Sequence, residues 1–247
     1  MKLKSLIGAL ALVAAGAVLA GSDAGSKITE LLKSRLGGVE VSQPKPTPVP
    51  GIYQAEFGGK IAYLTEDGRY AFVGDLIDLK NQVNLSEQVR REMARKAIEA
   101  VPLKDKAVYP AEGKTRTVLN VFTDTSCPYC KKLHQEVPQL QKAGIEVRYL
   151  PYPRGSSRGP GYQALKQVWC ADDKARAMNI AKGVESGSLP AGDCAEGAMV
   201  DKGYDLGNQL GVDGTPALFT ENGQKISGYV PAQQLIPMLL GQKPGGS

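Results

Sequence analysis

The sequence has little of what a metal centre or a nucleic-acid surface requires. It holds one histidine, His134, and four cysteines, at positions 127, 130, 170 and 194. A structural zinc ion almost always takes four Cys or His ligands, and Cys170 and Cys194 do not form a second close pair. The net charge of +5 is small for 247 residues, and both signs are interspersed along the chain. We therefore expect no metal, no cofactor and no nucleic-acid partner.

The first twenty residues contain no acidic side chain. Two lysines precede an apolar run from Leu6 to Ala17, and Val18 and Ala20 suit a small-residue cleavage site. The run is short for a membrane span and rich in Ala and Gly, and no cysteine follows it for lipid attachment. We predict that residues 1–20 are a cleaved signal peptide and that the chain is exported to an oxidising compartment, where disulfides persist.

The next segment predicts a small domain. SKITELLKSRLGG has helical spacing of its apolar residues, with Ser26 as N-cap and Gly37 as the stop. A proline-rich connector follows, and short runs over residues 52–79 are separated by Gly-containing turn signals typical of an antiparallel sheet. A core of this size is marginal, and oligomerisation often supplies the missing burial. We predict that residues 21–85 form an α+β dimerisation domain.

The remainder predicts a helix and then a larger domain. SEQVRREMARKAIEAVP has Ser86 as a candidate N-cap and only a thin apolar stripe, which favours a linker helix over residues 86–104. Residues 105–247 then show strand, helix, strand, a helical insert, a hairpin and a last helix, which is an α/β order. The predicted fold class for the whole chain is α+β.

The stretch TSCPYCKK places Cys127 and Cys130 two residues apart, where a strand gives way to a helix. A helix N-terminus favours a thiolate, and Pro128 suits the first helical position because it has no N–H to leave unsatisfied. A disulfide across so small a loop contributes little stability. We predict a redox pair in which Cys127 attacks and Cys130, one turn inside the helix, resolves mixed disulfides.

Four cysteines allow three connectivities, and sequence distance favours the pairs 127–130 and 170–194 without proving either. Thr215-Pro216 directly precedes a predicted strand. This placement is similar to that of the cis-proline that thioredoxin-like folds have opposite their active-site cysteines, so we expect a cis peptide bond rather than an ordinary trans turn. A cis bond would turn the Thr215 backbone toward an extended substrate. Among nearby side chains, His134 is interpreted as a packing residue rather than a proton shuttle. Asp124 is interpreted as solvated or capping rather than as a proton-transfer group.

At this point the chain resembles the DsbC/DsbG family of periplasmic thiol-disulfide isomerases, and more closely its DsbC branch. The resemblance covers nearly the whole mature chain. It rests on the joint order and spacing of four segments, FTDTSCPYCKKLH, GIEVRYLPYPR, VWCADDKARA and QLGVDGTPAL.

The resemblance implies a periplasmic homodimer with an N-terminal dimerisation domain, a linker helix and a thioredoxin-like domain with a helical insert. It implies that Cys127 attacks and Cys130 is its partner, and that Thr215 and Pro216 form the substrate-side loop. It further implies a structural disulfide between Cys170 and Cys194. Misoxidised exported proteins would be the substrates, and a membrane reductase of the DsbD type would be the electron donor.

One departure bears on the activity. The DsbC branch commonly has Gly-Tyr between the cysteines and His after them, whereas this chain has Pro128, Tyr129 and Lys131. A proline there is similar to the oxidase DsbA, and the intervening dipeptide tunes thiolate stability. We expect a disulfide isomerase, with a net disulfide oxidase or a redox-linked chaperone as the alternatives.

Overall fold

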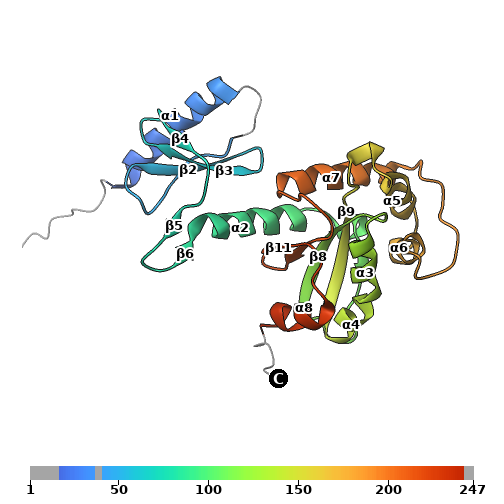
Figure 1. Cartoon of the computed structure of the whole chain (residues 1–247). Coiled ribbons are helices and arrows are strands. Elements are labelled where there is room, and N and C mark those ends of the chain that lie inside the picture. The colour runs from blue at the N-terminus through green and yellow to red at the C-terminus, as the bar shows by residue number, and fades with distance from the viewer. Residues whose placement is uncertain (1–16, 37–40, 242–247) are drawn as a thin grey trace, which may run out of the picture. The chain divides into compact units, whose positions relative to one another are not determined.

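The computed structural model describes residues 17–36 and 41–241, so most of the predicted signal peptide and the predicted helix stop at Gly37 lie outside the described residues. The chain divides into two compact units, Met1–Gly74 and Asp75–Ser247 (Figure 1). Within the described ranges, no helix combines the length and the apolarity needed to cross a membrane.

The first unit packs one helix on a small antiparallel sheet, as the sequence predicts. The helix is α1 (Ala17–Leu36) and the sheet order is β1-β2-β3-β4, with β1 at Lys45–Pro46, β2 at Ile52–Phe57, β3 at Lys60–Thr65 and β4 at Ala71–Phe72. Ile28 of the helix is buried with Tyr53, Ala55 and Leu64 of the sheet. The predicted start at Ser26 is wrong, because the preceding segment contains alanine, the strongest helix former, at intervals.

The second unit opens with a short ribbon, β5 (Ile77–Asp78) and β6 (Val83–Asn84), followed by α2 (Leu85–Glu99). Ser86 is not the N-cap that the sequence suggests. Asn84 has the extended backbone of a cap, and its side-chain oxygen accepts from the Glu87 N–H at 2.9 Å. Ser86 is buried, and its hydroxyl oxygen accepts from the Leu76 N–H at 2.7 Å.

A five-stranded sheet of order β11-β10-β8-β9-β7 forms the centre of the second unit. Only β8 and β9 are parallel, and the other neighbours are antiparallel. The strands are β7 (Ala107–Tyr109), β8 (Thr117–Thr123), β9 (Ile145–Pro151), β10 (Ala217–Thr220) and β11 (Lys225–Ser227). Strand β7 is not apparent from the sequence, because three residues are too few to show a period.

The helices of the second unit cover both faces of this sheet. They are α3 (Pro128–Gln135), α4 (Val137–Lys142), α5 (Tyr162–Trp169), α6 (Lys174–Lys182), α7 (Met199–Gln209) and α8 (Ala232–Leu239), with short 3-10 turns at Leu103–Asp105, Ser156–Arg158 and Ala195–Ala198. Side chains alternate between the two faces of the sheet along β8. Leu119 and Val121 lie in a hydrophobic cluster with residues of α3 to α6, whereas Phe122 lies in a second cluster on the opposite face. The predicted α+β class and helical insert are confirmed.

Helix α2 is packed more firmly than its thin stripe suggests. Ala94 and Ile98 are buried in the cluster that contains Phe122 and Phe219 on the second face of the sheet. At the turn between β10 and β11, Gly223 lies against the helix backbone, and a Cβ there would be 2.0 Å from the Arg91 carbonyl oxygen. No side chain fits at that turn, so the hairpin rests directly on α2.

Candidate active site

Strand β8 and helix α3 position the cysteine pair. The strand ends at Thr123, and Cys127 is the N-cap of α3 with an extended backbone, followed by Pro128 as the first helical residue. Cys130 lies one turn into the helix. Both sulfurs are free and both residues are nearly inaccessible, at 2% and 1% exposure.

The two thiols have opposite acidities. A hydrogen bond from Cys130 is the main cause that lowers the pKa of Cys127 to about 5, against the effect of burial, and Thr215 and the Arg154 guanidinium lower it further. Burial raises the pKa of Cys130 well above its usual range, and the hydrogen bond to Cys127 raises it further. At neutral pH the site therefore contains one thiolate, at Cys127, and one thiol, at Cys130.

The loop before β10 lies against the attacking sulfur. The Thr215-Pro216 peptide bond is cis, as expected from the sequence. In its protonated form the Cys127 thiol donates to the Thr215 carbonyl oxygen at 3.2 Å. The structure thus brings together Cys127 and Cys130 with Thr215 and Pro216, from two separate segments of the chain.

Asp124 is buried, so the interpretation as a solvated side chain is wrong, although it does accept backbone hydrogen bonds as a capping residue would. Oδ1 accepts from the Ser126 N–H and hydroxyl, both at 2.8 Å, and Oδ2 accepts from the Arg154 N–H and Nε. Burial opposes its ionisation, but these bonds outweigh burial and hold the pKa of Asp124 below its usual value. The carboxylate fixes Arg154 beside the active site.

Arg154 is a functional residue that the sequence reading did not single out. Its guanidinium is one of the charges that lower the pKa of Cys127. The segment GIEVRYLPYPR, which ends in this arginine, carried the family resemblance but gave no sign that the side chain returns to the cysteines. Lys131, the basic residue directly after the cysteine pair, is exposed and is not among the causes that shift the pKa of Cys127.

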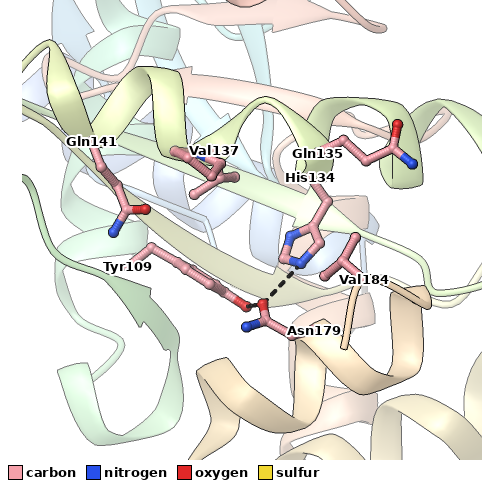
Figure 2. Close-up of a pocket in the computed structure, with 8 residues that line it drawn as sticks. Tyr109, His134, Gln135, Val137, Gln141, Asn179 and Val184 are labelled. Atoms are coloured by element: carbon pink, nitrogen blue, oxygen red, sulfur yellow. Dashed lines mark hydrogen bonds between the residues drawn. The ribbon is translucent and has the colours of Figure 1, made fainter. Parts of the chain in front are cut away.

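His134 is a packing residue, in agreement with the sequence interpretation. Figure 2 shows the imidazole between α3 and Asn179, with Tyr109 bonded to the same amide. The ring nitrogens lie 3.1 Å from the Tyr149 hydroxyl and 3.0 Å from Asn179 Oδ1. Burial is the main cause that lowers the pKa of His134 to about 4, so the ring is neutral at pH 7. A cavity of about 390 Å³ adjoins it.

The other two cysteines form a disulfide away from the redox pair. Cys170 and Cys194 are bonded, with their Cα atoms 5.7 Å apart, and they join the end of α5 to the turn before α7. In residues 17–36 and 41–241, no three His, Cys, Asp or Glu side chains gather as metal ligands would.

Two family models match the chain. The thioredoxin-like domain matches residues 104–242, and the disulfide bond isomerase protein N-terminal domain matches residues 16–87. The thiol:disulfide interchange protein DsbC of Escherichia coli K12 is 33% identical over 202 residues, which is 82% of each chain. DsbC of Haemophilus influenzae is 33% identical over 96% of this chain and 98% of the relative.

A solved structure of a disulfide interchange protein from Neisseria gonorrhoeae aligns with a TM-score of 0.47 at 25% identity, over 58% of this chain and all of that chain. The fold, the matched family models and the paired cysteines define a thioredoxin-like thiol:disulfide oxidoreductase, which is an enzyme class. Within that class, the chain belongs to the DsbC family of thiol:disulfide interchange proteins.

Proposed function

We propose that this protein is a periplasmic disulfide isomerase that attacks and rearranges incorrect disulfides in exported proteins. One observation carries the proposal: Cys127 is a thiolate at neutral pH beside a protonated, buried Cys130. An isomerase needs this asymmetry, because one sulfur must attack while the other waits. The names of the matched relatives support the same chemistry.

The reaction begins at Cys127. Its thiolate attacks one sulfur of a substrate disulfide, so that a bond from Cys127 to the substrate forms while the substrate bond breaks and releases a substrate thiolate. That thiolate, or another substrate cysteine, then attacks elsewhere and frees Cys127. If no substrate thiol does so, Cys130 attacks Cys127 Sγ and leaves the enzyme oxidised. A membrane reductase of the DsbD type would return the pair to the reduced state.

Thr215 and Pro216 are proposed to hold the substrate. The Thr215 backbone reaches the Cys127 sulfur, which is where an extended peptide would run past the attacking atom. Hydrogen bonds to a backbone require no particular side chains. Such a contact suits an enzyme that acts on many misoxidised proteins. Cys170 and Cys194 are proposed to be structural.

The active form is proposed to be a homodimer held by residues 21–85, with residues 86–104 leading to the catalytic domain at 105–247. Strand β4 is at the edge of its sheet, and Tyr70, Phe72 and Val73 on and beside it are 60%, 46% and 68% exposed. An edge strand with exposed apolar side chains is a ready surface for pairing with a second copy.

Pro128 supports a second candidate, a net disulfide oxidase. A strongly stabilised thiolate favours the reduced form of a cysteine pair and makes its disulfide a better oxidant. The pKa of Cys127 at about 5 is compatible with such a pair. The chaperone activity that the family resemblance suggests would accompany either reaction.

Two measurements separate these candidates. We expect thiol trapping in cells to find Cys127 reduced, and the purified protein to rescue a scrambled multi-disulfide substrate faster than it oxidises a fully reduced one. Cys127→Ser provides the background rate. A disulfide-bonded Cys127 at rest, together with faster oxidation than rescue, would make the protein an oxidase.

A further inference from the structure

Lys182 is a buried lysine that the reaction above does not use. It is the last residue of α6 and is 4% exposed. Its ammonium donates to Thr123 Oγ1 at 2.9 Å and to the Asp124 carbonyl oxygen at 3.4 Å. Within the described part of the chain it takes part in no ion pair, and the Asp124 carboxylate is occupied by Arg154 and Ser126. Burying a charge without a partner of opposite sign is costly.

Thr123 connects this ammonium to the second cysteine. It is the last residue of β8 and is fully buried. A threonine hydroxyl has one hydrogen to donate and two lone pairs to accept. Because its oxygen accepts from Lys182, the hydrogen is left for its other partner, the Cys130 sulfur. The chain of contacts therefore runs from Lys182 through Thr123 to Cys130.

We propose that Lys182, acting through the Thr123 hydroxyl, is the positioning residue that stabilises the Cys130 thiolate when a mixed disulfide is resolved. The inference rests on the proposed role of Cys130 as the resolving cysteine. It gives the buried ammonium, which makes no ion pair within the described residues, a further negative partner that forms during the reaction, besides the charges of Cys127 and Asp124 that already favour it.

Cys130 loses its proton, and its sulfur attacks Cys127 Sγ. The Cys127–Cys130 bond forms while the bond between Cys127 and the substrate sulfur breaks, and the departing substrate sulfur takes up one proton to become a thiol. As Cys130 loses its proton, the Thr123 hydrogen points to the charge that forms on the Cys130 sulfur, and the Lys182 ammonium, bound to the Thr123 oxygen, strengthens that hydrogen bond. No other oxidant or reductant is needed.

The charge on Lys182 is itself sensitive to pH. Burial is the main cause that lowers the pKa of Lys182 to about 8. The titratable groups that face it are Cys130, Cys127 and Asp124, which favour its charge, Lys131, which opposes it, and the neighbouring rings of Tyr149 and His134. Lys182 is thus charged below about pH 8 and neutral above it. It therefore stabilises the Cys130 thiolate only below about pH 8.

The test follows the lifetime of the mixed disulfide. Reduced protein is mixed with excess oxidised glutathione, samples are quenched in acid, and intact mass reports the Cys127–glutathione adduct. We expect Lys182→Met to lengthen the adduct lifetime about tenfold at pH 7. The difference in adduct lifetime between the two proteins should shrink as pH rises past 8. One reason is that Lys182 of the unsubstituted protein loses its charge, and the other is that hydroxide removes the Cys130 proton in both proteins.

Lys106→Met is the matched control. Lys106 is also 4% exposed, lies in the same unit, and donates to a backbone oxygen, that of Ile98, away from the cysteines. It should leave the adduct lifetime within about twofold at every pH. Thr123→Val, which removes the hydroxyl but keeps the shape, should slow resolution as Lys182→Met does, and Thr123→Ser should recover most of the rate.

The outcomes are distinguishable. An equal effect of the two lysine substitutions, or a Lys182→Met effect that does not change between pH 6 and 10, would overturn the inference. If Lys182→Met does not fold, Thr123→Val with an unchanged adduct lifetime overturns it instead. An unsubstituted protein that never passes through a Cys127 adduct would overturn the proposed roles of the cysteines themselves.

Discussion

At the scale of single residues, Cys127 and Cys130 have the same side chain and lie three positions apart, but their pKa values are shifted in opposite directions. Cys127 is at the end of a helix, where Cys130, Thr215 and Arg154 converge on its sulfur. Cys130 is enclosed by the core, and burial keeps its proton in place. The difference comes from position in the fold, since both residues are cysteines of one short motif.

Substitution of each cysteine separates attack from resolution. Cys127→Ser should reduce rescue of a scrambled substrate to background, because a hydroxyl is not ionised at neutral pH. Cys130→Ser should keep part of the activity in a glutathione buffer and should accumulate substrate bonded to Cys127. Non-reducing electrophoresis checks this, and an adduct that accumulates in Cys127→Ser instead would reverse the two roles.

The lowered pKa of Cys127 predicts how stability depends on pH. In the reduced protein the folded pKa, about 5, is below the unfolded value of about 9. The thiolate therefore stabilises the folded state fully above pH 9, and this contribution is lost as pH falls to 5. The oxidised protein has no such group.

We expect the free energy of unfolding of the reduced form, relative to the oxidised form, to increase from pH 5 to pH 8. Urea unfolding of both forms measures this difference. Reduced Cys127→Ser should show no such increase, and a flat difference in the unsubstituted protein would contradict the predicted acidity.

Local motifs made some of these residues predictable. The role of Cys127 could be predicted from its immediate neighbours in the sequence, and the cis bond at Thr215-Pro216 from the likeness to thioredoxin-like folds. The roles of Arg154 and Lys182 could not be predicted, because these residues lie 27 and 55 positions after Cys127 in the chain. Nothing local distinguishes a lysine that ends buried beside Thr123 from one that ends in solvent.

At the scale of elements, the Cys170–Cys194 disulfide holds the helical insert together. The bond closes a loop with a sequence separation of 24. The chain-entropy estimate for such a loop is about 3.5 kcal/mol. Replacing both cysteines with alanine should lower the free energy of unfolding by about this amount in urea titration. A loss below about 1 kcal/mol would mean that the insert is held by its packing alone.

Strand β4 should determine the oligomeric state. Val73 is 68% exposed directly after this edge strand. We expect Val73→Glu to shift the protein from dimer to monomer in light scattering, because a buried charge at a strand-pairing surface is unfavourable. Leu103→Glu is the matched control, since Leu103 is 53% exposed but lies in the second unit. An unchanged dimer in Val73→Glu would place the interface elsewhere.

The types of most elements followed from sequence periodicity, whereas their ends did not. Strands β8 and β9 are long apolar runs and were predictable. The start of α2 was misplaced by two residues, because Asn84 and Ser86 are both good caps and only the turn of the preceding ribbon selects between them. Tertiary contacts decide such ends.

At the scale of the whole molecule, the proposed export predicts where the mature chain begins. We predict that protein purified from the periplasm begins near Gly21, because Val18 and Ala20 suit the cleavage enzyme. The intact mass of the exported protein checks this prediction, and the intact mass of the same protein retained in the cytoplasm is the comparison. Exported material that retains residues 1–20 would contradict the periplasmic assignment.

The bare turn at Gly223 has a mechanical consequence. Its backbone rests on α2 at Arg91, and the strand on one side of that turn, β10, begins directly after Pro216. Ala94 and Ile98 of α2 also pack in one cluster with Phe219 of β10, so helix and hairpin are joined both by backbone contact and by packed side chains. A tilt of α2 would therefore be passed through the hairpin and β10 to the Thr215-Pro216 loop, which faces Cys127 and is proposed to hold the substrate.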